Sequence, residues 1–203
     1  MKDLAAATWE DVSAAWAGLG YYSRARNLHA CAKRVTGRGG FPQDANALRE
    51  LPGVGPYTAA AIAAIAFDEK AAPVDGNIER VMSRVRAIGS DGTEAGWRRA
   101  KVEIGARTQE LFDALPPTQR AGDLAQALMD LGATVCTSRK PNCLICPLAK
   151  ICAARAGGGP ERYAVEAAKE GRPVRDGAAF VLMRGGEVLL VRPGERVPTD
   201  GEV

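Results

Sequence analysis

The stretch Leu51–Ala59, which reads Leu-Pro-Gly-Val-Gly-Pro-Tyr-Thr-Ala, decides the fold of this chain. Helical patterns precede and follow it. Gly53 and Gly55 permit a tight turn because glycine carries no side chain that would obstruct it, and Pro56 suits the first position of the next helix. Backbone N–H groups of such a turn and helix start can donate to a phosphate. We therefore expect a helical hairpin whose residues Gly53, Val54 and Gly55 bind a phosphate backbone.

Most of the remaining sequence up to residue 153 also reads as helices separated by glycine and proline. Thr8 and Asp11 form a capping-box pattern at the start of one helix. Asp44 and Asp75 stand as N-caps at the starts of two others. The expected helices cover, approximately, residues 9–17, 23–35, 45–51, 56–67, 76–85, 94–112 and 123–131.

The character of the sequence changes after residue 153. Residues 154–175 are rich in glycine, alanine and charged side chains, which is typical of a linker. The segments Ala178–Met183 and Val188–Val191 then read as two strands around a turn at Arg184–Glu187. Because an isolated hairpin is only marginally stable, we expect residues 176–203 to be the start of a second domain.

Composition and charge narrow the class of protein. No apolar run in the 203 residues is long enough to cross a bilayer, and the N-terminus lacks the organisation of a secretory signal. We therefore expect an intracellular protein without a membrane partner. Residues 12–43 contain five basic and no acidic side chains, and residues 131–160 contain four basic and none acidic. Such blocks favour a polyanionic partner, although solvated helix faces would give the same pattern.

A cluster of cysteines follows the last expected helix. The spacing is C-x6-C-x2-C-x5-C, and four thiolates so close in sequence can bind a tetrahedral zinc ion or a [4Fe–4S] cluster. Zinc ribbons usually place two C-x2-C pairs on separate turns, so a single pair flanked by lone cysteines favours the cluster. Arg139 and Lys140 lie between the first two cysteines, where a metal-bound loop can present them to a phosphate. The expected metal ligands are Cys136, Cys143, Cys146 and Cys152.

The cysteine spacing resembles the iron–sulfur loop of endonuclease III and of the MutY-type adenine glycosylases, and Leu51–Ala59 matches the helix-hairpin-helix motif of the same superfamily. The resemblance covers nearly all of residues 3–153. It implies that Asp75, about eighteen residues beyond Tyr57, is the essential aspartate rather than a helix cap alone. A helix N-terminus favours the negative charge of Asp75, which can stabilise the positive charge that develops as a glycosidic bond breaks.

Two positions discriminate within the superfamily. Endonuclease III-like enzymes carry a lysine where this chain has Tyr57, and Thr-His where it has Gly76-Asn77; both differences match the MutY pattern. The resemblance implies a monofunctional glycosylase that acts as a monomer on double-stranded DNA. It would remove adenine mispaired with 8-oxoguanine or guanine. In this family the residue at Tyr57 supports the aspartate and the sugar, and the residue at Asn77 lines the pocket.

The heptapeptide Gly18–Arg24 carries a third similarity. From the residues alone, its aromatic pair is either a plug in the core or a wedge between bases. In MutY-type enzymes the first tyrosine, here Tyr21, enters the duplex beside the oxidised guanine. The resemblance therefore implies an all-α helix-hairpin-helix glycosylase domain with a [4Fe–4S] loop at residues 1–153. After the linker come residues 176–203, the first β-hairpin of a truncated MutT-like α+β domain.

The resemblance also implies that a catalytic group is missing. The family places a short helical region with a proton-donating glutamate before the point that corresponds to residue 1, and residues 1–11 offer no replacement. Our hypothesis is that the chain is truncated at both ends and that its activity is impaired or absent, since proton transfer contributes ~10²–10⁴-fold. Two alternatives remain: an endonuclease III-like glycosylase/lyase, and a DNA-binding module that recognises mismatches without catalysis.

Overall fold

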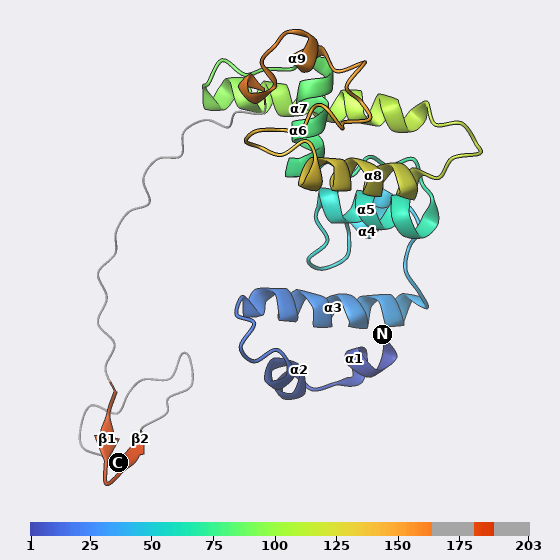
Figure 1. The fold of residues 1–203 in the computed structure, drawn as a ribbon. Helices are drawn as coiled ribbons and strands as arrows, with labels where there is room; N and C mark the ends of the chain where they lie inside the picture. The colour runs from blue at the N-terminus through green and yellow to red at the C-terminus, as the bar shows by residue number, and fades with distance from the viewer. Residues whose placement is uncertain (164–180, 189–203) are drawn as a thin grey trace. The chain divides into compact units, whose positions relative to one another are not determined.

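The computed structural model describes residues 1–163 and 181–188, and the chain divides into two units, Met1–Ala168 and Lys169–Val203. The described part of the first unit is helical, and none of its helices is long and apolar enough to cross a membrane (Figure 1). The elements of this unit are α1 (Lys2–Ala6), α2 (Trp9–Ala15), α3 (Tyr22–Arg38), α4 (Ala45–Leu48), α5 (Pro56–Phe67), α6 (Gly76–Arg86), α7 (Glu94–Asp113), α8 (Ala121–Thr134), α9 (Ala153–Ala156) and the 3-10 helix η1 (Pro160–Arg162).

The helix starts follow the expected caps. The Thr8 side chain accepts from the N–H of Asp11 at 3.1 Å and the Asp11 carboxylate accepts from the N–H of Thr8, so the predicted capping box is confirmed. Asp44 caps α4 by accepting from the N–H of Ala47 at 2.8 Å. Pro56 is the first residue of α5, as expected. The short helix α1 has no counterpart in the sequence analysis, because five residues are too few for a periodic apolar pattern.

A first small core joins α3 to the hairpin. Cys31 and Val35 of α3 pack with Leu48, Leu51 and the alanines of α5. Helices α1 and α2 both contact α3, on its side away from this core (Figure 1). The buried Cys31 thus behaves as a small apolar side chain, and burial raises the pKa of its thiol.

A second core lies among α6, α7 and α8. The predicted stripe of α6 is buried at Ile78, Val81 and Met82, and Val85 packs at its margin. Ile104 and Phe112 of α7 are fully buried against it. Helix α8 contacts both α5 and α6, so it connects the hairpin helix to the helix that begins at Asp75.

Two glycines allow α8 to approach its neighbours closely. A Cβ atom at Gly122 would lie 2.8 Å from the carbonyl oxygen of Ala64 in α5. One at Gly132 would lie 2.6 Å from the Cβ of Asn77 in α6. Both distances are shorter than real Cβ contacts, so α8 can occupy this place only without side chains at the two positions.

The described part of the second unit is a short antiparallel hairpin. Strands β1 (Met183–Arg184) and β2 (Glu187–Val188) pair Met183 with Val188 and Arg184 with Glu187. The predicted turn at Arg184–Glu187 is therefore too long: Gly185 and Gly186 alone form it, both with positive φ, which suits a two-residue hairpin turn. The sequence also predicts strand at residues 181 and 182, but β1 begins only at Met183. The predicted strand residues 178–180 and 189–191 lie outside the described residues, and the domain boundaries at 153 and 175 stay predictions.

Candidate nucleic-acid interface and iron–sulfur site

The turn of the hairpin has the geometry predicted at one of its two glycines, Gly53. Gly53 has φ +77°, a left-handed conformation that favours glycine, and its Cα faces Asn27 of α3 so closely that a Cβ would lie 2.6 Å from the Asn27 Cβ. Val54 donates to the carbonyl of Leu51 at 3.1 Å and packs on the first core, and Gly55 is the N-cap of α5. No side chain of the described residues caps α5. The first N–H groups of α5 therefore lie at an exposed turn and can donate to an anion.

Asp75 begins α6 with a carboxylate that is held on both oxygens. Its Oδ1 accepts from the N–H groups of Asn77 at 3.0 Å and Ile78 at 2.8 Å, while its Oδ2 accepts from the side-chain amide of Asn77 at 3.0 Å. The side chain is half-buried. The predicted cap at Asp75 is thus present. The same contacts fix the carboxylate at the positive end of the helix dipole.

Tyr57 and Asn77 contact neighbouring points on α8. The hydroxyl of Tyr57 donates to the Sδ of Met129 at 3.8 Å, and Asn77 touches Gly132, three residues further along the same helix. Residues three apart share one face of a helix. Helix α8 therefore brings the start of α5 and the start of α6 to one side, with Tyr57 still 41% exposed.

Arg80 connects the Asp75 turn to the cysteine loop, which we define as residues 136–152. Its guanidinium donates to Asn77 Oδ1 at 2.8 Å, to the carbonyl of Gly132 at 2.6 Å and to the carbonyl of Cys136 at 2.7 Å. Asn77 is thereby oriented from both sides, by Asp75 and by Arg80. The sequence analysis did not find Arg80, since an arginine within a helix has no local signal that it contacts residues more than fifty positions away.

Tyr21 also has an unusual backbone conformation. It is the N-cap of α3 with φ +46° and ψ 53°, a left-handed conformation that is uncommon outside glycine, and its side chain is 80% exposed. The indole N–H of Trp16 donates to the carbonyl of Gly20 at 2.8 Å and holds the preceding turn. The interpretation of Tyr21 as a core plug is wrong, because the ring is in solvent. Its neighbour Tyr22 is also exposed.

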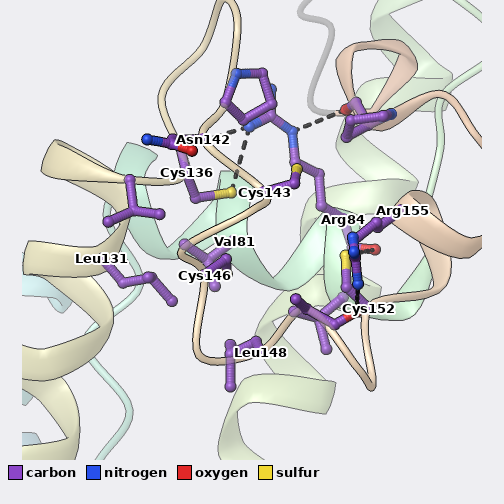
Figure 2. A pocket seen from close by; sticks show the side chains of 15 residues that line it. Val81, Arg84, Leu131, Cys136, Asn142, Cys143, Cys146, Leu148, Cys152 and Arg155 are labelled. Atoms are coloured by element: carbon purple, nitrogen blue, oxygen red, sulfur yellow. Dashed lines mark hydrogen bonds between the residues drawn. The ribbon is translucent and has the colours of Figure 1, made fainter.

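The four cysteines of the loop line one cavity, together with side chains of α6 and α8 (Figure 2). Each is half-buried. Burial raises the pKa of the Cys143 thiol, and the charges of Cys152, Cys136 and Cys146 raise it further. The positive charge of Arg155 lowers the pKa of the same thiol.

The donor set fits an iron–sulfur cluster. Four cysteines that line one cavity suit a [4Fe–4S] cube, because each thiolate binds a different iron at a different corner. The buried guanidinium of Arg84 beside Cys136 supplies a positive charge that suits a group held by four thiolates.

Arg139 and Lys140 lie exposed at the start of the cysteine loop. Lys140 has φ +49°, and its backbone N–H donates to the carboxylate of Glu161 at 2.6 Å. The hydroxyl of Thr137 donates to the carbonyl of Arg139 at 3.0 Å. The backbone of both basic residues is therefore held in place while their side chains stay available to solvent.

Comparison with known protein families gives two matches. Residues 1–104 match the HhH-GPD superfamily of base excision DNA repair proteins, and residues 136–152 match the iron–sulfur binding domain of endonuclease III. The iron–sulfur cofactor predicted from the cysteine spacing is thus confirmed, and the second match begins and ends at the first and last cysteines of the loop.

Several curated proteins named adenine DNA glycosylase are similar in sequence. The human protein is 46% identical over 158 residues, which cover 76% of this chain and 28% of that protein. The protein of Arabidopsis thaliana is 44% identical over 71% of this chain and 22% of its own length. The protein of Mycobacterium tuberculosis is 36% identical over 93% of this chain and 61% of its own length. The chain therefore spans between about a fifth and three fifths of these relatives.

Solved structures of a DNA glycosylase and of endonuclease III have a similar fold. A thermostable thymine-DNA glycosylase superposes with a TM-score of 0.60 at 30% identity, and a non-covalent endonuclease III–DNA complex with a TM-score of 0.57 at 26% identity. Each match covers 77% of this chain and 70% of the other. Together with the match over residues 1–104, the hairpin and the cysteine loop establish that this chain belongs to the HhH-GPD superfamily of base excision DNA repair proteins.

Proposed function

We propose that this chain is the hairpin-bearing part of an adenine-specific DNA glycosylase. The proposed enzyme hydrolyses the N-glycosidic bond of adenine mispaired with 8-oxoguanine or guanine and has no lyase activity. The observation that carries the proposal is the turn Asp75-Gly76-Asn77, in which both oxygens of the carboxylate are engaged at the start of α6. Its support comes from Tyr57 where a lyase would have lysine, and from the curated relatives named adenine DNA glycosylase.

In this proposal Asp75 supplies negative charge to the breaking glycosidic bond. A fixed carboxylate stabilises the cationic sugar that forms as adenine leaves, and it costs no reorganisation because Asn77 and the helix start already hold it. Asn77 lines the pocket for the flipped base. Tyr57, at the start of α5 and in contact with Met129 of α8, supports the carboxylate and the sugar.

The proposed DNA surface combines three contacts of different kinds. The N–H groups of Gly53 and Gly55 bind one phosphate, while that of Val54 donates to Leu51 and shapes the turn between them. Arg139 and Lys140 bind phosphates through their charges. The exposed ring of Tyr21 enters the base stack, which offsets part of the cost of flipping the adenine. The four cysteines hold the [4Fe–4S] cluster that orders the loop carrying Arg139 and Lys140, so the cluster positions DNA and takes no part in hydrolysis.

We extend the proposal to residues 154–203 and to the oligomeric state of the protein. Residues 154–175 serve as a linker, and residues 176–203 begin a MutT-like domain that helps to recognise 8-oxoguanine. The protein acts as a monomer.

The test is single-turnover release of adenine from a duplex with one A:8-oxoguanine pair. It is carried out with the 203-residue chain and with a version extended at the N-terminus by the helical region that the family resemblance suggests. We expect release by the extended version, tighter binding of the mismatch than of matched duplex by both, and weaker release by the shorter chain.

Two controls separate the alternatives. Borohydride trapping on an abasic duplex detects a Schiff base, and a covalent product would favour an endonuclease III-like lyase over the proposed hydrolase. Binding of the A:8-oxoguanine duplex without release by either version would favour a non-catalytic mismatch-binding module. Equal release by both versions would show that the shorter chain has its full catalytic set.

A further inference from the structure

Arg84 is a buried cation that no carboxylate accompanies among the described residues. Its side chain is only 2% exposed, and it lies on α6 one turn beyond Arg80. A buried charge is costly unless it is paired or fully hydrogen-bonded. The hydrogen-bond acceptors of the Arg84 guanidinium therefore indicate the role of this residue.

All five contacts of the guanidinium go to the cysteine loop and the segment just after it. It donates to the carbonyls of Thr137 at 2.7 Å and Ser138 at 3.1 Å, and to the carbonyl and the Sγ of Cys136, each at 3.3 Å. Its Nε donates to the carbonyl of Pro160 at 2.8 Å, beyond the last cysteine. One side chain thus holds the beginning of the loop and the segment that follows its end.

The backbone of Arg84 reaches the last cysteine as well. The thiol of Cys152 lies 3.5 Å from the carbonyl oxygen of Arg84, so the same residue contacts the first cysteine through its side chain and the fourth through its main chain. A guanidinium has five N–H donors in a rigid plane, which lets it serve several carbonyls at once. A lysine at this position could keep the charge but could not make all these contacts.

We propose that Arg84 is the positioning residue for the iron–sulfur cluster: it closes the two ends of the cysteine loop, and its hydrogen bond to the Sγ of Cys136 raises the reduction potential of the cluster. The physical reason for the second effect is charge. A donor and a positive charge beside a ligating sulfur stabilise the reduced cluster, which is the more negative state. This inference does not depend on which base the enzyme removes.

The experiment compares the variants Arg84→Gln and Arg84→Lys with the unchanged 203-residue chain. Measured are the iron content per chain, the rate at which a chelator removes the visible absorbance of the cluster, the midpoint potential and the helix content. We expect Arg84→Gln to hold its cluster about 10–100-fold more weakly, the effect on affinity of removing a partner of a metal ligand, and therefore to lose it faster to the chelator. Its midpoint potential should become more negative. Arg84→Lys should also lose its cluster faster, with a smaller change in potential because the charge stays.

Arg86→Gln is the matched control, since it removes the same charge from an exposed position of the same helix. If Arg84→Gln does not accumulate as folded protein, the comparison of Arg84→Lys with Arg86→Gln tests the proposal. The proposal is overturned if the folded Arg84 variants hold their cluster as firmly as Arg86→Gln does. It is also overturned if both variants lose their helix content, which would make Arg84 a residue of the helical core. Loss of adenine release with unchanged cluster retention would likewise overturn it, because the role of Arg84 would then lie outside the cluster.

Discussion

Asp75 has two tasks that one substitution can separate. As a cap it accepts from the N–H groups at the start of α6, and as the proposed catalytic group it offers a negative charge. Asparagine is an equally good N-cap, so Asp75→Asn should lower stability by at most about 1 kcal/mol, the value of one lost hydrogen bond to Asn77. Base release should fall by about 10²-fold or more, because the stabilising charge is gone.

The measurement is single-turnover release of adenine in whichever chain length is active, together with urea unfolding. Asp44→Asn is the control, since Asp44 caps α4 in the same way without lying at the proposed site. An Asp75→Asn variant with undiminished release would refute the role proposed for this carboxylate.

The turn of the hairpin depends more on Gly53 than on Gly55. An alanine at Gly53 would take the left-handed conformation at a cost of about 1–2 kcal/mol, and its Cβ would collide with Asn27 of α3. At Gly55, φ is −82° and nothing lies within 4 Å of the place that a Cβ would take, so Gly55→Ala should cost only about 0.5–1 kcal/mol, because alanine is a poorer N-cap than glycine.

Urea unfolding of Gly53→Ala and Gly55→Ala measures this difference, and duplex binding shows whether the turn still presents its N–H groups. Equal stability of the two variants would mean that the turn adapts and that its left-handed residue is not a constraint.

The packing of α8 against α6 places the proposed site. A methyl group at Gly132 would meet the Cβ and the carbonyl of Asn77, so Gly132→Ala should force the two helices apart and cost about 1–3 kcal/mol. It should also slow base release, because Asn77 and Arg80 lose their alignment. Gly37→Ala is the control: Gly37 is exposed within α3 with open space around it, and the change should stabilise the chain by about 0.5–1 kcal/mol. A Gly132→Ala variant as stable as Gly37→Ala would contradict the close packing.

On the scale of the whole molecule, the uneven distribution of basic residues predicts the salt dependence of DNA binding. Each phosphate contact contributes about −0.9 to the slope of a plot of the logarithm of the DNA association constant against the logarithm of the salt concentration. Arg139→Gln should therefore weaken binding of every duplex sequence alike and make the slope less steep by about 0.9. Arg98→Gln is the control, because Arg98 is exposed on α7 and pairs with Glu94. Equal slopes for the two variants would exclude Arg139 from the interface.

The sequence by itself determined the features that depend on neighbouring residues. The turn at Gly53 follows from the freedom of glycine, and the caps at Thr8, Asp44 and Asp75 lie within three residues of the N–H groups they bind. The cysteine spacing indicated the cofactor for the same reason, since the four thiols lie in one short loop. Local geometry of this kind can be read without knowledge of the fold.

Only the tertiary structure decided the contacts between distant segments. Helix α8 begins at Ala121 rather than near Asp123 because the Asp68 carboxylate, fifty-three positions away, accepts from the N–H of Ala121 at 2.8 Å. The sequence likewise could not show that Arg80 and Arg84 reach from α6 to the cysteine loop. Such contacts are fixed by the packing of α5, α6 and α8, and packing depends on the whole arrangement of side chains, which leaves no periodic or local pattern in the sequence.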